Sequence, residues 1–214
     1  MDNLVFLRTQ DLHEEPFTTS EIISKSIGYD HFRITCTIDK FIEDFQEMGE
    51  TQKIVVYNQD TARQSSVYQL NEQQATLLMT YLGNKKEVRE FKKELVRQFY
   101  RMRSELNKRA ITREIVKEGR RKLTDVIKEK IPDTKWTYKH LTDLDYKCVL
   151  GMNAKQFETR YNIPNGKIRD YIHADQLQQV GILEAAEKAL VEAGYTYHEI
   201  KDILSRKFLD RKTG

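Results

Sequence analysis

Apolar residues recur every three or four positions through the middle of the chain, and this period predicts one long helix. Its apolar stripe consists of Val88, Phe91, Leu95, Phe99, Met102 and Leu106. A second apolar set from Leu123 to Ile131 continues the pattern up to Pro132, where a helix is disfavoured. Gly119 lies inside this run and costs roughly 1 kcal/mol relative to alanine in a helix interior. We therefore expect it to be tolerated or to mark a bend.

The pattern before the long helix predicts two short helices followed by a β-hairpin. Residues 20–26 form the first helix, after N-cap candidates at Thr18–Ser20 and before a turn at Gly28. The second helix runs from Asp30 to about Met48. Two helices joined by a glycine-containing turn predict a helix-turn-helix, and a following hairpin makes it a winged helix. The remaining expected elements are a strand-like run at 3–8, antiparallel strands at 53–57 and 66–70, and a helix at 71–82.

The last third of the chain predicts an all-helical domain. Thr142 and Asn153 are candidate N-caps for two helices, and Thr196 with Glu199 fits a capping box for a third. The expected helices cover residues 143–150, 154–161, 175–193 and 197–208. The predicted fold is thus mainly α with a small β-hairpin: a winged helix-turn-helix domain (1–83), a long basic connecting helix (84–131) and a helical C-terminal domain (132–214).

Residues of the hairpin and the long helix resemble, in type and spacing, the phage regulatory proteins of the Rha family. The positions that carry this resemblance are Tyr68, Leu70, Leu78, Gly83, Lys86, Phe91, Lys92, Phe99 and Met102. The resemblance implies a phage-encoded regulator that acts in the cytoplasm of a bacterial host cell. The stretches RRKLTDVIK, WTYKHLTDLDYK, GMNAKQF and KIRDYI resemble a module behind the N-termini of phage antirepressor-type proteins, and that second resemblance implies no biochemical role.

Composition and motifs argue against a membrane protein and against an enzyme. No run approaches the roughly 20 apolar residues of a membrane span, and the first residues lack the basic and apolar regions of a secretory signal. Cys36 and Cys148 lie far apart, and the five histidines show no metal-ligand spacing. The chain contains no G-x-S-x-G, GxGxxG or Walker A motif. We therefore expect no catalytic residues, cofactor, metal or small-molecule substrate.

Charge is distributed unevenly, which leaves two hypotheses about the binding partner. Residues 1–83 hold 6 basic and 13 acidic residues, a net −7, whereas residues 84–122 hold 15 basic and 6 acidic, a net +9. The acidic domain favours an antirepressor that binds a repressor protein, and the basic helix permits a regulator that binds double-stranded DNA. The candidate contact residues are His31, Arg33, Thr35, Asp39, Glu43 and Asp44 of the second helix, Arg63 of the hairpin loop, and Lys92, Lys93 and Arg97 of the long helix.

Three of these features have a second interpretation. His31 lies where the Rha-like pattern places a histidine; it could donate to a phosphate or a base edge, or it could cap or pack the turn. The basic faces of the long helix could contact a partner, or they could be solvated and paired along the helix. The apolar stripe could pack on the N-terminal domain, or it could form a self-association seam in a homo-oligomer.

Overall fold

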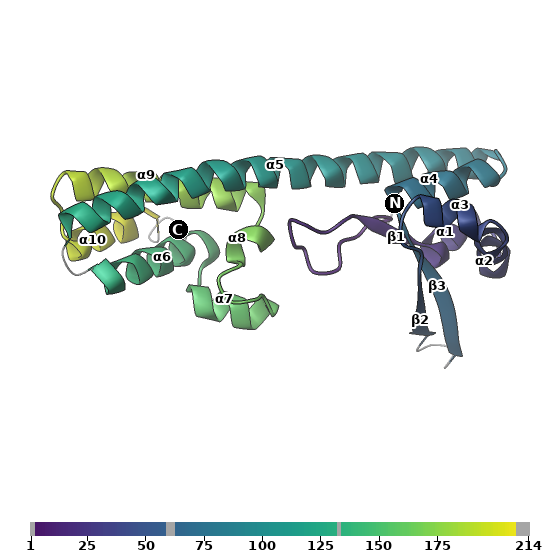
Figure 1. The fold of residues 1–214 in the computed structure, drawn as a ribbon, viewed down its shortest axis with the longest axis horizontal. Helices are drawn as coiled ribbons and strands as arrows, with labels where there is room; N and C mark the ends of the chain where they lie inside the picture. Colours follow the sequence, from purple (N-terminus) through teal and green to yellow (C-terminus); the bar gives the residue numbers. More distant parts are fainter. Residues whose placement is uncertain (1–2, 59–62, 132–133, 209–214) are drawn as a thin grey trace. The chain divides into compact units, whose positions relative to one another are not determined.

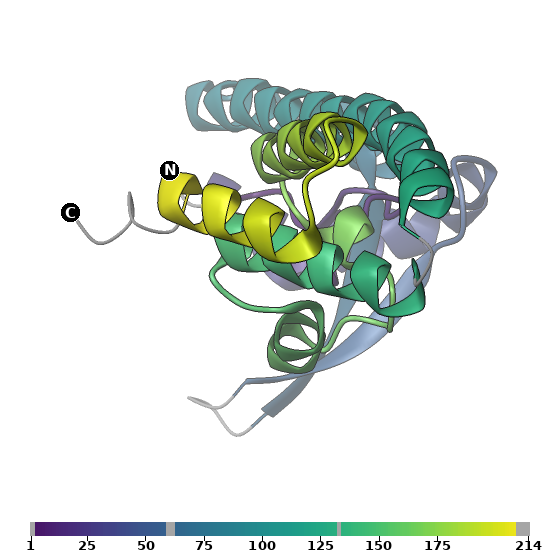
Figure 2. The same cartoon turned by 90° about the vertical axis from the view of Figure 1, so that its left-hand side faces the viewer.

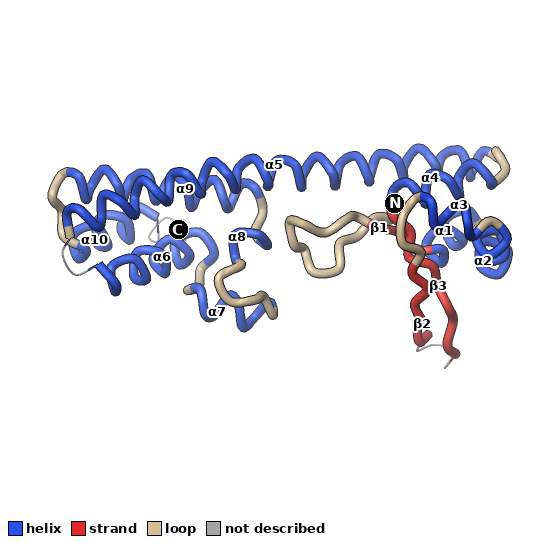
Figure 3. Tube along the Cα trace, viewed as in Figure 1, coloured by secondary structure: helices blue, strands red, loops and turns tan. Residues whose placement is uncertain are grey.

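The computed structural model describes residues 3–58, 63–131 and 134–208, which form two compact units. The N-terminal unit comprises residues 1–9 and 13–104, and the C-terminal unit comprises residues 10–12 and 105–214. The described chain is mainly helical, with ten helices and one three-stranded sheet, which belongs to the N-terminal unit (Figure 3). The longest helix, α5 (Lys86–Lys130), supplies residues to both units.

The N-terminal unit places helices α1 to α4 around a small antiparallel sheet (Figure 1). The sheet has the order β1-β3-β2, with Thr18 opposite Leu70 and Ile54 opposite Val67. The elements in chain order are β1 (Phe17–Thr19), α1 (Ser20–Ile27), α2 (His31–Lys40), α3 (Ile42–Glu47), β2 (Gln52–Asn58), β3 (Arg63–Asn71) and α4 (Glu72–Tyr81).

Local signals set the ends of α1, as the sequence predicts. The Thr19 hydroxyl oxygen accepts a hydrogen bond from the Ile22 amide at 3.2 Å, which caps the first turn. Gly28 ends the helix in the left-handed conformation, with φ 67°, which glycine adopts without steric cost. The strand-like run at residues 3–8 forms no full strand, and within it Phe6 makes an isolated antiparallel bridge to Phe17.

The second predicted helix, residues 30–48, is wrong as a single helix. Phe41 has φ −117° and ψ 33°, outside helical geometry, and it separates α2 from α3. Its ring stacks on Tyr81 of α4 with 4.7 Å between the centroids, and the buried Phe45 packs on the same tyrosine. The break accompanies this aromatic packing against α4, which the helical period alone does not encode.

The apolar stripe of α5 packs inside the N-terminal unit. Val88, Phe91, Leu95 and Phe99 are at most 4% exposed, and Met102 packs against the same core. Their neighbours in this core include Ile23, Ile34, Ile38, Phe45, Leu70 and Leu78. Of the two interpretations of the stripe, the structure thus supports packing on the N-terminal domain, because a self-association seam would need these side chains exposed.

The C-terminal unit packs the later part of α5 with five further helices (Figure 2). Helix α6 contacts both α9 and α10, and one apolar core joins these three helices to Leu123 and Ile127 of α5. A second core joins Val116 of α5 to α8 and α9. The five helices are α6 (Thr134–Leu150), α7 (Ala154–Tyr161), α8 (Ile168–Tyr171), α9 (Ala174–Glu192) and α10 (Tyr197–Phe208).

The predicted helix caps in this unit have mixed outcomes. Asn153 caps α7, and Thr196 with Glu199 caps α10, as expected; Gln156 completes a capping box at Asn153 that was not predicted from the sequence. Thr142 is not an N-cap, because it lies inside α6 and its hydroxyl donates to the Tyr138 carbonyl at 2.8 Å. A threonine can satisfy its hydroxyl in this way without ending a helix.

Among the described helices, none combines the length and hydrophobicity needed to cross a membrane.

Candidate binding surfaces

Helix α2 presents an exposed aromatic and basic surface. Phe32 is 73% exposed at the start of the helix, and the Arg33 guanidinium lies 4.7 Å from the centre of the Tyr29 ring. A shallow hollow of about 580 Å³ adjoins them. We call this the α2 surface; its hollow is lined by Phe32, Arg33, Cys36, Thr37, Lys40, Phe41 and Tyr81.

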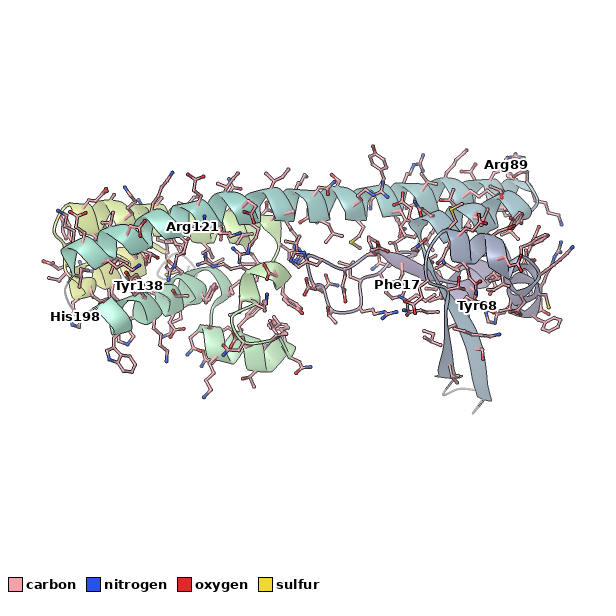
Figure 4. The ribbon with its side chains drawn as sticks, in the orientation of Figure 1. Phe17, Tyr68, Arg89, Arg121, Tyr138 and His198 are labelled. Carbon is pink, nitrogen blue, oxygen red and sulfur yellow. The ribbon has the colours of Figure 1, made fainter. Side chains whose placement is uncertain are left out.

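His31 packs the turn between the first two helices. Its Nε2 lies 2.9 Å from the hydroxyl oxygen of the buried Ser20, which also accepts a hydrogen bond from the Tyr68 amide at 2.9 Å. The contacts join α2, α1 and β3 (Tyr68 is labelled in Figure 4). The packing interpretation of His31 therefore accounts for its position.

Two of the three predicted acidic contact residues have partners within the N-terminal unit. Asp39 accepts a hydrogen bond from the Tyr68 hydroxyl and lies 3.7 Å from the Lys53 amine. Asp44 accepts a hydrogen bond from the Tyr81 hydroxyl at 2.6 Å. Burial, and then the hydrogen bond to Asp39, raises the pKa of Tyr68, so that this tyrosine remains a donor.

The break at Phe41 also changes which helix is acidic. Glu43, Asp44 and Glu47 belong to α3, so that within α2 itself Arg33 and Lys40 outnumber the one carboxylate, Asp39. Glu43 and Glu47 are exposed and one turn apart, and neither has an ion-pair partner in the part of the chain that the structure describes. The acidic recognition helix expected from the sequence is therefore two helices of different charge.

The other predicted contact residues lie apart from the α2 hollow. The Thr35 hydroxyl donates to the Phe32 carbonyl at 2.9 Å. The side chain of Arg63 falls outside the described residues. Lys92 donates to the Leu82 carbonyl at 3.2 Å and to the Asn84 side chain at 2.9 Å, and so holds the chain that follows α4.

Lys93 and Arg97 pair along α5. Lys93 lies 3.0 Å from Glu90, and Arg97 lies 3.6 Å from Glu94. The hydrogen bond from Lys93 lowers the pKa of Glu90, which keeps this exposed pair charged. These contacts match the paired, solvated interpretation of the basic helix, in which exposed pairs contribute little to stability.

Most of the N-terminal unit matches a known protein family. Residues 18–104 match the family model of the phage regulatory protein Rha. The Rha-matching region begins in β1, includes the α2 surface and extends along α5 to the end of the N-terminal unit. The match supports a phage regulatory protein. No curated protein matches the chain.

The C-terminal unit contains a buried charged cluster that the sequence reasoning missed. Asp145 of α6 and Glu184 and Glu187 of α9 are at most 1% exposed. Arg120 of α5 and Arg169 of α8 both donate to Glu184 Oε1, at 3.2 and 2.5 Å. The sequence contains a signal for this cluster, because Glu184 and Glu187 occupy positions of the buried face of α9. The apolar residues of that face include Leu177, Val180 and Val191.

Burial controls the ionisation of this cluster. It raises the pKa of Glu187 to about 8 and places the pKa of Asp145 well above its usual range, because a charged carboxylate loses its hydration there. The neighbouring carboxylate Glu184 raises both pKa values further, whereas Arg120 and Arg169 lower them. No group of His, Cys, Asp and Glu within the described chain could hold a metal ion.

Proposed function

We propose that the chain is a phage-type regulator of the antirepressor kind, which controls gene expression by binding a repressor protein through the α2 surface and α3. The N-terminal unit is then a winged helix-turn-helix in which α2 occupies the recognition position. The Rha match supports the regulatory role. The single observation that carries the proposed binding mode is the exposure of Phe32 beside Arg33.

An exposed phenylalanine next to an arginine favours a protein partner. Burying a side chain of this size stabilises a complex by about 1.5–3 kcal/mol. Aromatic residues and arginine are enriched in the cores of protein interfaces, where few residues supply most of the binding free energy. Tyr29 already holds the Arg33 guanidinium by a cation–π contact, which reduces the entropy lost on binding.

Charge favours the same kind of partner. Residues 1–83 carry a net −7, and Glu43 and Glu47 of α3 lie exposed beside the α2 surface. Phosphates of DNA are repelled by these carboxylates, whereas a basic patch on a repressor is attracted and its association is faster.

A second candidate function is a DNA-binding transcriptional regulator. It is favoured by the charge of α2 itself, which contains two basic residues, Arg33 and Lys40, and one acidic residue, Asp39. Asp39 already pairs with Lys53. In this alternative, α2 enters the major groove and the β2–β3 hairpin contacts the backbone.

Purification of the tagged chain from host lysate, with and without nuclease, separates the two candidates. We expect a protein partner that remains bound after nuclease treatment. The double variants Phe32→Ala/Arg33→Ala and Glu43→Lys/Glu47→Lys should each weaken binding by at least about tenfold, a loss of about 1.4 kcal/mol or more. Asp39 and Asp44 are left unchanged because both contact tyrosines.

The matched control is Tyr100→Ala/Arg101→Ala, which removes an equally exposed aromatic–arginine pair from α5. It should retain the partner. The repressor-binding proposal fails if nuclease releases everything that is bound. It also fails if the purified chain binds a defined DNA duplex and Arg33→Ala abolishes that binding, in which case the protein reads an operator.

A further inference from the structure

The C-terminal unit contains an open basin of about 1130 Å³ between α5, α6, α7 and α8. Seven of its lining side chains are basic and two are acidic. Both acidic side chains are engaged by the backbone: Asp143 accepts a hydrogen bond from the Ala154 amide at 3.1 Å, and Glu158 accepts one from the Gly166 amide at 2.6 Å. The lining of the basin therefore carries an excess of basic over acidic side chains.

The floor of the basin consists of Arg120 and Arg169, whose side chains are 22% and 11% exposed. Both guanidinium groups converge on one oxygen of Glu184. Hydrogen bonds to the Thr142 hydroxyl at 2.5 Å and the Tyr146 hydroxyl at 3.3 Å fix their orientation. Two cations thus share one carboxylate.

The remaining carboxyl groups of the cluster do not neutralise this excess. Burial raises the pKa of both Asp145 and Glu187, that of Glu187 to about 8, because a charged carboxylate loses its hydration there. Neither carboxyl group hydrogen-bonds to Arg120 or Arg169 in the described chain, so the two guanidinium groups of the floor share the carboxylate of Glu184.

The rim consists of Arg121 of α5, Lys139 of α6 and Lys155 of α7, all exposed. None of the three has an ion-pair partner in the described chain. Besides the floor and the rim, two further basic residues line the basin, and both pair with carboxylates: Arg113 with Asp170, and Lys117 with Glu114. Figure 4 labels Arg121 on α5 and Tyr138, which also lines the basin, on α6. Unpaired like charges that surround one hollow attract a multiply charged anion.

We propose that this basin binds a run of phosphate groups, carried by a free nucleotide or by a nucleic-acid strand. Guanidinium groups match phosphate oxygens in a bidentate geometry, and lysines add point charges at the rim. A single phosphate would leave most of the basin empty, since ligand pockets of about 300–1,000 Å³ hold much larger molecules. Because the floor and the rim together present five basic side chains, they suit a ligand that carries several negative charges.

Isothermal titration calorimetry on the full chain tests this with three probes: sodium tripolyphosphate, adenosine triphosphate and a single-stranded oligonucleotide. The rim variant Arg121→Gln/Lys139→Gln/Lys155→Gln should bind roughly tenfold more weakly than the unchanged chain. With the oligonucleotide, each lost phosphate contact should reduce the salt slope by about 0.7. The probe that binds most tightly identifies the source of the phosphates.

The matched control is Lys128→Gln/Lys147→Gln/Lys201→Gln, which removes the same charge from exposed lysines that do not line the basin. It should retain the affinity of the unchanged chain, as should Phe32→Ala/Arg33→Ala in the other unit. Equal losses in the rim and control variants would show that net charge alone attracts the probe and would overturn the proposal. Absence of binding by all three probes would overturn it as well.

Discussion

Asp145 and Glu187 are two neighbouring buried carboxyl groups, and within the described chain no basic or backbone group donates a hydrogen bond to either. The groups around Glu187 come from five helices: Arg120 (α5), Asp145 (α6), Arg169 (α8), Glu184 (α9) and Tyr197 (α10). Desolvation outweighs the attraction of the two arginines, and the pKa of Glu187 rises to about 8. A buried acid of this kind makes stability depend on pH.

The free energy of unfolding should fall as pH rises from about 4.5 to about 8. In this window the folded chain holds a proton on Glu187 that the unfolded chain has released, so unfolding becomes easier by up to about 1.4 kcal/mol per pH unit for each such proton. Below the window both states are protonated, and above it the loss is complete. Glu187→Gln should flatten the slope.

Urea unfolding at a series of pH values measures this dependence. Asp202→Asn, which changes an exposed carboxyl group of α10, serves as the control and should leave the slope unchanged. If Glu187→Gln and the unchanged chain gave the same slope, Glu187 would not be the group that titrates.

At the scale of elements, α9 approaches α5 closely at one glycine. A Cβ built on Gly181 would lie 2.8 Å from a methyl carbon of Val116, closer than side chains tolerate. Valine is branched at Cβ and has little rotamer freedom in a helix, so it cannot move aside cheaply. Gly119 on α5 is the opposite case, because no heavy atom lies within 4 Å of the same built position.

Gly181→Ala should therefore destabilise the chain by about 1–3 kcal/mol, despite the better helix propensity of alanine. Gly119→Ala should stabilise it by up to about 1 kcal/mol, since it improves propensity without a clash. Urea unfolding of both variants gives the comparison. Equal stabilisation by the two substitutions would mean that α9 and α5 are not in close contact at Val116.

At the scale of the whole molecule, self-association remains a prediction that must use other residues than the buried stripe. Ile111 and Ile115 on α5 are 64% and 67% exposed and lie one turn apart. Exposed aliphatic pairs on one helix face are suited to helix–helix contacts. We therefore expect this pair, and not Val88 to Phe99, to contribute to any homo-oligomer.

Light scattering at micromolar concentration should give a mass of at least twice the 25.4 kDa of one chain. Ile111→Glu/Ile115→Glu should reduce the mass to that of one chain, because charged side chains at the contact repel one another. Ile182→Glu/Ile203→Glu, on other exposed helical positions, is the control and should leave the oligomer intact. A single-chain mass for the unchanged protein would refute self-association.

The sequence by itself determined most helix starts and ends, because these depend on contacts within a few residues. Thr19 and Gly28 bound α1, and Asn153 with Gln156 caps α7, as local hydrogen bonding and backbone sterics require. The sequence also predicted the antiparallel hairpin and the stripe of α5, since apolar period reflects burial. The Rha resemblance likewise rests on residues near one another in the chain.

Only the tertiary structure decided which distant residues each helix face and each charged side chain contacts. The break at Phe41 coincides with the stacking of its ring on Tyr81, forty residues away, and it separates the acidic α3 from the basic α2 surface. The basin collects charges from four helices, and its floor depends on Arg120 and Arg169 meeting Glu184. Periodicity tells which face of a helix is buried, but the packing of distant segments decides what that face contacts and which charges remain unpaired.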